Sequence, residues 1–334
     1  MKIGILSITE GGRRLATELA AKMPDALLLP KENGVARTLA AHWREMDGFI
    51  CIMAAGIVVR AIAPLLQDKE SDPCVVVLDE KGHHAVSLLS GHLGGGNDLA
   101  RQVAALVGGE AVLTTASDTL GLAALDLWAR DQDLVCEDKE GLTRASARLV
   151  NTGSLGIYAE VAIASLPQGL AAVAGPELAD IVISPRIGDY GGAVVFRPKN
   201  LVLGVGCNRG APVAELRQAC EELFAEQGLS RLSIRNLASI DLKQDEAGLL
   251  AFAEEQGWRL EFFSKEELNR VENVTVSEAA LRNVGAVGVA EPAALLSAQS
   301  NDLLVGKRKW RNVTMAVARA NFMLSAQDRA PQDI

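Results

Sequence analysis

The chain has 334 residues, with 33 Lys and Arg against 42 Asp and Glu, which gives a formal net charge of −9. Hydrophobic residues make up 49% and charged residues 22%, a balance that excludes a disordered or fibrous chain. The acidic balance argues against general nucleic-acid binding, because the basic excess that neutralises phosphates is missing. Aromatic residues, at 4%, are too few to stack bases along a single strand.

No stretch of the sequence approaches the ~20 consecutive apolar residues of a membrane-spanning helix. Met1–Ile8 leads directly into an apolar, strand-like run, without the basic start and cleavage site of a signal peptide. The five cysteines are scattered and form no C-x-x-C pair, which argues against a disulfide framework or a structural zinc site. We therefore expect a cytoplasmic protein that binds neither nucleic acid nor a membrane.

The amino-terminal section, residues 1–130, alternates short apolar runs with segments of helical spacing. The apolar runs predict strands at Lys2–Ile8, Ala26–Leu29, Gly48–Met53, Cys74–Leu78, Ala85–Leu89 and Ala111–Leu113. The segments between them predict helices at Gly12–Lys22, Val35–Trp43, Gly56–Leu66, Asn97–Val107 and Leu120–Arg130. This alternation predicts an α/β domain whose mostly parallel sheet carries helices on both faces, with ligands in the loops at the carboxyl ends of its strands.

Two further sections follow. Residues 131–199 predict a small α+β middle or linker domain, with a hinge at Arg197–Pro198 because X-Pro sequences end regular elements. Residues 200–326 predict a compact carboxyl-terminal α/β domain, and residues 327–334 a frayed tail. Within the carboxyl domain the sequence predicts strands at Leu201–Gly206, Leu232–Ile240, Arg259–Phe262, Leu303–Val305 and Val313–Arg319. It predicts helices at Val213–Glu226, Glu246–Gln256 and Lys265–Val271, the last of which begins after a capping box at Ser264.

The most informative motif of the amino section is the glycine-rich loop Ser-Gly-His-Leu-Gly-Gly-Gly-Asn-Asp, residues 90–98, between a predicted strand and a predicted helix. Its glycines leave backbone N–H groups free to approach a carboxylate or phosphate, and the helix start adds partial positive charge. His92 is a candidate general base. The alternatives are a tight turn capped by Asn97 or Asp98 and an ordinary loop histidine.

Two other polar loops follow strands of the same section. Residues 53–60 place Gly56 and Arg60 at a helix start, and residues 114–118 place hydroxyl groups and Asp118 after a strand. Each loop alone is a weak signal, because Arg60 also fits a surface charge and Asp118 a helix cap. Together with the glycine-rich loop, they predict convergence on one crevice. The pair His83-His84 follows Gly82 in a predicted hairpin turn and lacks a third ligand for a metal.

In the carboxyl section, residues 204–212 read Gly-Val-Gly-Cys-Asn-Arg-Gly-Ala-Pro, close to a dinucleotide fingerprint. The acidic residue at the required distance, Glu226, falls inside a predicted helix, so nicotinamide binding is disfavoured. Cys207 is a candidate nucleophile, but no histidine follows His92 in the chain, which favours a packed thiol. The basic run of residues 307–311 fits a solvated face or, together with Arg209, a carboxylate site.

At these motifs the chain resembles the cobalt-precorrin-5A hydrolase family of anaerobic cobalamin biosynthesis. The resemblance covers nearly the whole chain and rests on five stretches in the family's order: residues 91–98, 204–212, 239–243, 289–294 and 309–317. The carboxyl loop departs from the family pattern. It has Asn208, Arg209 and Ala211 where the family usually carries two arginines before the glycine and a threonine after it, which leaves one positive charge fewer.

The resemblance implies a hydrolase that opens the δ-lactone of a cobalt-corrinoid intermediate and releases acetaldehyde, giving cobalt-precorrin-5B. The substrate is an anionic tetrapyrrole-like small molecule. Its cobalt belongs to the substrate, so the resemblance implies no cofactor: neither a resident metal nor a nicotinamide. Neighbouring enzymes of the cobalamin pathway and a second copy of the chain, as a homodimer, are the protein partners to consider.

Under this resemblance the candidate residues acquire roles. His92 is the predicted base, oriented or replaced by Asp98 or Asp118, while guanidinium and backbone N–H groups hold carboxylates or the lactone oxygen. The predicted substrate-binding residues are Gly56, Arg60, Gly91, Gly94, Gly95, Gly96, Asn97, Thr115, Ser117, Gly206, Cys207, Asn208, Arg209 and Gly210. They occur in both outer sections, which predicts a substrate cleft between them. A corrinoid carrier without chemistry and a nucleotide-dependent enzyme that uses residues 204–210 are the alternatives.

Overall fold

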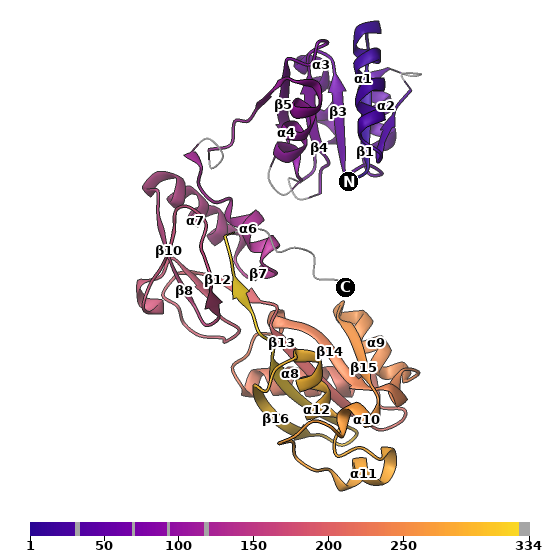
Figure 1. Ribbon diagram of the computed structural model, residues 1–334, viewed down its shortest axis with the longest axis vertical. Coiled ribbons are helices and arrows are strands. Elements are labelled where there is room, and N and C mark those ends of the chain that lie inside the picture. Colours follow the sequence, from indigo (N-terminus) through magenta and orange to yellow (C-terminus); the bar gives the residue numbers. More distant parts are fainter. Residues whose placement is uncertain (31–33, 69–70, 92–93, 117–119, 327–334) are drawn as a thin grey trace. The chain divides into compact units, whose positions relative to one another are not determined.

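The computed structural model describes residues 1–30, 34–68, 71–91, 94–116 and 120–326. The chain divides into two compact units, Met1–Leu127 and Trp128–Ile334, with the boundary inside helix α6 (Leu125–Asp131). The first unit holds a six-stranded sheet, and the second holds two five-stranded sheets and a two-stranded one (Figure 1). The division into separate middle and carboxyl domains stays a prediction. In the described part of the chain, no helix is both long and apolar enough to cross a membrane.

The sheet of the first unit has the strand order β2-β1-β3-β4-β5-β6. Its strands are β1 (Ile3–Ser7), β2 (Ala26–Leu28), β3 (Gly48–Ile52), β4 (Cys74–Leu78), β5 (His84–Leu89) and β6 (Glu110–Val112). Strands β1 to β4 are parallel, β5 is antiparallel to β4, and β6 is parallel to β5. The predicted mostly parallel α/β sheet is therefore confirmed, with each strand within about two residues of its predicted bounds.

Helices cover both faces of this sheet. Along β3, Ile50 and Ile52 pack under α1 (Glu10–Lys22) and α4 (Gly96–Val107), whereas Phe49 and Cys51 pack under α2 (Val35–His42) and α3 (Ala55–Ile62). This alternation follows from the two-residue period of a strand, and it explains why the central strands are apolar at every position.

A tight hairpin joins β4 to β5, as the sequence predicted around Gly82. The Asp79 carboxylate accepts backbone N–H bonds from Lys81, at 2.9 Å, and from His84, at 2.7 Å. Gly82 has φ +71°, a left-handed conformation that glycine adopts without a steric penalty. The hairpin reverses the chain, so β5 and β6 run opposite to the first four strands.

The middle sheet has the order β10-β8-β11-β12-β7 and is parallel except for β7. Its elements are β7 (Leu134–Cys136), α7 (Lys139–Thr152), β8 (Leu155–Ala159), β10 (Leu170–Ala172), β11 (Ile181–Ile183) and β12 (Val194–Pro198), while β9 (Ala162–Ile163) pairs with β18 (Met323–Leu324). Helix and strands therefore occur together in residues 131–199, in agreement with the predicted α+β character of this section.

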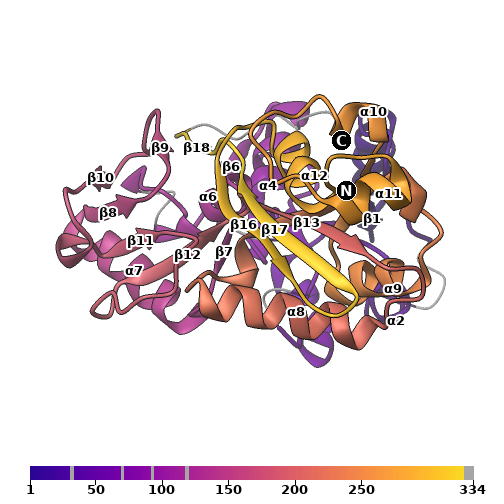
Figure 2. The same cartoon turned by 90° about the horizontal axis from the view of Figure 1, so that it is seen from below.

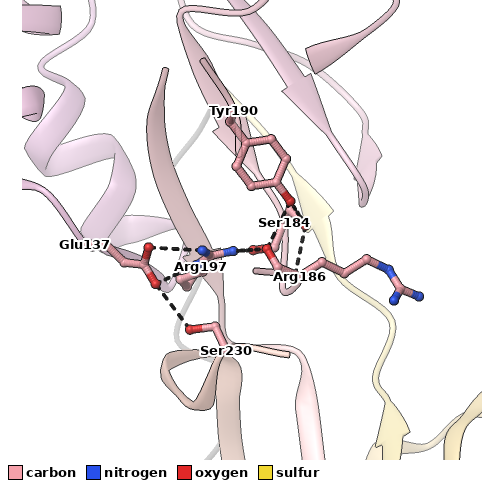
Figure 3. A network of polar contacts seen from close by, with 6 residues as sticks. All are labelled: Glu137, Ser184, Arg186, Tyr190, Arg197 and Ser230. Carbon is pink, nitrogen blue, oxygen red and sulfur yellow. Dashed lines mark hydrogen bonds and ion pairs between the residues drawn. The ribbon is translucent and has the colours of Figure 1, made fainter. Parts of the chain in front are cut away.

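The predicted hinge at Arg197–Pro198 is wrong. Arg197 lies within β12 and is only 2% exposed. Its guanidinium forms an ion pair with Glu137, at 2.8 Å, and donates to the carbonyl oxygens of Ser184 and Arg186 (Figure 3). Ser230, from the carboxyl part of the unit, donates to the same Glu137 carboxylate at 3.3 Å. This network fixes the segment that the proline pattern suggested would bend.

The carboxyl sheet has the order β15-β14-β13-β17-β16, with β13, β14 and β15 parallel and β17 antiparallel to β13. Its elements are β13 (Leu201–Cys207), α8 (Val213–Glu226), β14 (Ile234–Ile240), α9 (Ala247–Gln256), β15 (Arg259–Phe263), α10 (Lys265–Leu268), α11 (Glu278–Val284), α12 (Ala290–Ala298), β16 (Leu303–Lys309) and β17 (Val313–Arg319). Helices α8 and α12 cover opposite faces (Figure 2). The capping box at Ser264 is confirmed, although its helix ends at Leu268.

Candidate functional site

The glycine-rich loop and the loop after β3 lie at opposite edges of the amino sheet. Because β5 and β6 run against β4, their carboxyl ends lie at the edge where β1, β3 and β4 begin. Two contacts agree with this: Ser90 Oγ donates to Asp72 O at 3.0 Å, just before β4, and a Cβ on Gly95 would lie 3.4 Å from Met1 Sδ. The prediction that all three polar loops converge on one crevice is therefore wrong.

The glycines of the glycine-rich loop have a packing explanation. A Cβ on Gly94 would lie 2.7 Å from Ser90 O, and one on Gly96 would lie 2.9 Å from Leu89 O, so neither position accepts a side chain without a backbone shift. Gly95 adopts the left-handed conformation, with φ +77°.

The amides at the start of α4 are also engaged within the loop. Gly96 N donates to Ser90 O at 3.1 Å, and Asn97 N donates to Gly91 O at 2.9 Å. These bonds stabilise the turn and leave fewer N–H groups for an anion than the glycine count suggests.

The loops after β5 and β6 do meet each other. The buried Asn97 donates from Nδ2 to Thr115 Oγ1 at 3.0 Å, which joins two predicted site residues. Asp98 is exposed on α4 and forms an ion pair with Arg101 at 2.9 Å. Three predicted site residues, His92, Ser117 and Asp118, lie outside the described residues.

In the carboxyl domain, Gly204 and Gly206 lie in strand β13 rather than in a loop. A Cβ on Gly204 would overlap the Ala290 carbonyl oxygen at the start of α12, and one on Gly206 would lie 2.6 Å from Thr314 Oγ1. These two glycines therefore allow a helix and a neighbouring strand to approach closely, which accounts for the fingerprint-like spacing without a dinucleotide.

The turn after β13 is held by the loop after β14. Arg209 Nη1 forms an ion pair with Asp245 at 2.5 Å, and Gly210 N donates to the buried Glu246 carboxylate at 2.8 Å. Lys243 Nζ, which is also buried, lies 3.3 Å from the second oxygen of Glu246. A substrate carboxylate at Arg209 must therefore compete with Asp245 for the guanidinium.

Cys207 and Asn208 complete this predicted group. Burial raises the pKa of the Cys207 thiol to about 11, so little thiolate exists near neutral pH and the packed-thiol interpretation is favoured. Asn208 is exposed, and its Nδ2 lies 3.2 Å from Asn312 Oδ1 in the β16–β17 turn.

A cavity of about 420 Å³ lies at the carboxyl ends of β1, β3 and β4. Ile8, Met53 and Ala54 are among its apolar lining residues, and Asp79 and His84 are among its polar ones. Gly56 and Arg60 lie in α3, which starts at this edge. The sequence singled out His84 only as a metal candidate and missed Asp79.

A second cavity, of about 720 Å³, lies wholly in the second unit. Lys199 and Arg235 line it together with Trp258 and Phe322. Burial lowers the pKa of the Lys199 ammonium and of the Arg235 guanidinium, because both charges have lost part of their hydration. A bound anion would offset that loss. No motif marked these two cations in the sequence.

Comparison with known proteins covers most of the chain. The family model described as Cobalamin synthesis G N-terminal matches residues 37–118, and Cobalamin synthesis G C-terminus matches residues 201–318. The cobalt-precorrin-5A hydrolase of Priestia megaterium is 37% identical over 306 residues, which cover 86% of this chain and 82% of the relative. The cobalt-precorrin-5A hydrolase of Salmonella typhimurium is 30% identical, covering 96% of this chain and 98% of the relative.

Among solved structures, a cobalamin biosynthesis protein G homologue from Sulfolobus solfataricus is 22% identical and covers 96% of this chain and 97% of that chain, with a TM-score of 0.40. The two family models and the curated relatives agree with one another along the sequence. On these sequence matches, the chain belongs to the cobalt-precorrin-5A hydrolase family of cobalamin-biosynthesis enzymes.

Proposed function

We propose that this protein is a cobalt-precorrin-5A hydrolase that opens the δ-lactone of a cobalt-corrinoid intermediate and releases acetaldehyde, giving cobalt-precorrin-5B. The observation that carries the proposal is the 37% identity with the Priestia megaterium hydrolase over 86% of this chain. One water enters and one acetaldehyde leaves, so the reaction needs no oxidant or reductant. Cobalt arrives with the substrate, so the proposal includes neither a resident metal nor a nicotinamide. We also propose that the protein is cytoplasmic.

The chemistry needs a base for the attacking water, donors for the oxygen that becomes negative, and cations for the acetate and propionate groups. The base nominated from the sequence is His92, with Asp98 or Asp118 as its partner. To act as the partner of the base, Asp98 must give up its exposed ion pair with Arg101. Such a pair contributes at most about 1 kcal/mol, so breaking it costs little.

For the substrate carboxylates we propose Lys199 and Arg235. The two partly desolvated cations outnumber Asp133, a carboxylate that lines the same cavity, which favours an anionic ligand. Trp258 and Phe322 line the same cavity and offer apolar contact to a flat ring. The polycarboxylate corrinoid combines both features.

The variant Arg235→Gln is expected to weaken binding of the lactone substrate about tenfold, since a charge-assisted bond contributes ~1.5–3 kcal/mol. An anaerobic titration followed by the corrinoid absorption spectrum measures this Kd. Arg259→Gln is the matched control, because Arg259 is an exposed arginine of the same sheet and is not among the residues lining the cavity. Equal Kd values for the two variants would contradict the assignment.

The reaction itself is tested by incubating the full chain anaerobically with the lactone-bearing cobalt intermediate and trapping the aldehyde. We expect one acetaldehyde for each substrate consumed. Binding of the corrinoid without acetaldehyde would support the carrier alternative and overturn the proposal. In the same assay, full turnover by His92→Ala would remove His92 from the mechanism.

A further inference from the structure

The cavity at the carboxyl ends of β1, β3 and β4 lies at a topological switch point of the amino sheet. From β1 the chain continues into α1, which packs on one face, whereas from the adjacent β3 it continues into α3, which packs on the opposite face. The two connections diverge and leave a crevice, the place where open α/β sheets bind ligands. Its volume, about 420 Å³, is in the range of small-molecule sites.

A histidine and a carboxylate form a pair in this crevice. His84 Nδ1 lies 3.6 Å from Asp79 Oδ2, and both residues line the cavity. The hairpin fixes the carboxylate through the backbone N–H groups of Lys81 and His84. Burial alone would raise the pKa of Asp79, but these N–H bonds lower it on balance, so the carboxylate stays ionised beside the ring. With Nδ1 turned to the carboxylate, Nε2 is the nitrogen available to a water molecule.

The start of α3 lines another part of the cavity through Ala54, Ala55 and Ile57, and a helix amino terminus carries partial positive charge. No side chain caps α3 at Ala54, so first-turn N–H groups such as that of Gly56 lack intrahelical partners. A Cβ on Gly56 would lie 3.5 Å from Arg60 Nη1, which brings the guanidinium over this helix start. Within the residues that the structure describes, Arg60 has no ion-pair partner. Glu80 also lines the cavity, and its carboxylate lies against Gly11 at the start of α1.

We infer that lactone opening takes place in this crevice, with His84 as the base, Asp79 as its positioning residue, and Arg60 with the α3 amides as the oxyanion donors. The inference rests on the proposed reaction and is independent of the assignment of Lys199 and Arg235, whose cavity lies wholly in the second unit. Water gives a proton to Nε2 while its oxygen bonds to the lactone carbonyl carbon. The ring C–O bond then breaks, and the alkoxide takes the proton back. Acetaldehyde leaves when this hydroxyl group loses its proton and the carbon–carbon bond to the macrocycle breaks, with the bonding electron pair staying on the macrocycle carbon, which takes up a proton. Because the glycine-rich loop lies at the other edge of the sheet, His84 and His92 are competing assignments.

The decisive variant is His84→Gln, with His83→Gln as the matched control. Both histidines are exposed neighbours of Asp79, but only His84 lines the cavity. We expect His84→Gln to slow single-turnover acetaldehyde release at least about a hundredfold while the Kd of the corrinoid stays within about twofold, and His83→Gln to match the wild type. His84→Gln turning over at the wild-type rate, or both variants slowing equally, would overturn the inference.

Two further results separate the roles. If the wild-type chain releases no acetaldehyde, the proposed function is wrong. If the wild type is active and His84→Gln releases acetaldehyde at the same rate, only the assignment of His84 is wrong. Asp79→Asn is expected to lower kcat about tenfold with KM unchanged, and Asp79→Glu to restore part of the rate. A purely structural role in the hairpin would instead lower the thermal midpoint of both variants and leave kcat of the folded fraction unchanged.

Discussion

Replacing Arg197 with methionine is expected to lower the free energy of unfolding of the second unit by about 3 kcal/mol. The side chain is only 3% exposed, and its guanidinium bonds to Glu137 and to the carbonyl oxygens of Ser184 and Arg186. Methionine preserves most of the volume but leaves these acceptors without their donor. The Glu137 side chain is 37% exposed, so water hydrates part of its carboxylate after the arginine is removed. The loss of stability is therefore at the lower end of the range for breaking a buried ion pair.

Urea unfolding followed by tryptophan fluorescence measures this loss. In a Trp43→Phe background the remaining tryptophans, Trp128, Trp258 and Trp310, all belong to the second unit. Arg186→Met is the matched control. The Arg186 side chain is 51% exposed, and its ion pair with Glu160 is long, at 3.7 Å, so the substitution should change the free energy of unfolding by less than about 0.5 kcal/mol. Equal unfolding midpoints for the two methionine variants would refute the role given to Arg197.

The loops around the amino sheet show which features of the fold can be predicted from the sequence. The strands themselves were predicted from their Ile, Val and Leu content, and the hairpin turn from Gly82. β4 ends at Leu78 and β5 starts at His84, and so short a connection permits only antiparallel pairing. That connection length already implies that the glycine-rich loop lies at the opposite edge from Arg60, and it brings His84 beside Asp79.

The glycines of β13 illustrate a different limit. Their spacing resembles a phosphate-binding loop, but Gly204 is small because of α12 and Gly206 because of Thr314 in β17, and both neighbours lie more than about 80 residues later in the chain. The ion-pair partner of Arg197, Glu137, likewise lies 60 residues away in the chain, and the local proline pattern at Pro198 indicates a hinge instead. Local periodicity predicts elements, whereas close approaches between elements depend on contacts that the sequence order does not reveal.

Substituting Gly204 with alanine tests that conclusion directly, and we expect it to destabilise the second unit by about 3 kcal/mol. The new Cβ would overlap the Ala290 carbonyl oxygen and lie 2.9 Å from the Ala294 Cβ, so α12 must shift from the sheet as a unit. Backbone atoms on a helix cannot rotate away as a flexible side chain can, which places the cost at the upper end of overpacking.

Gly306→Ala is the matched control, because Gly306 is an exposed strand glycine of the same sheet and the nearest atom to its added Cβ, Glu291 Oε1, lies at 3.5 Å. It should leave stability unchanged or raise it by up to about 1 kcal/mol, since alanine restricts the unfolded chain. The same urea experiment compares the two variants. A Gly204→Ala protein as stable as Gly306→Ala would mean that α12 does not require the bare strand, and the fingerprint-like spacing would again need a ligand to explain it.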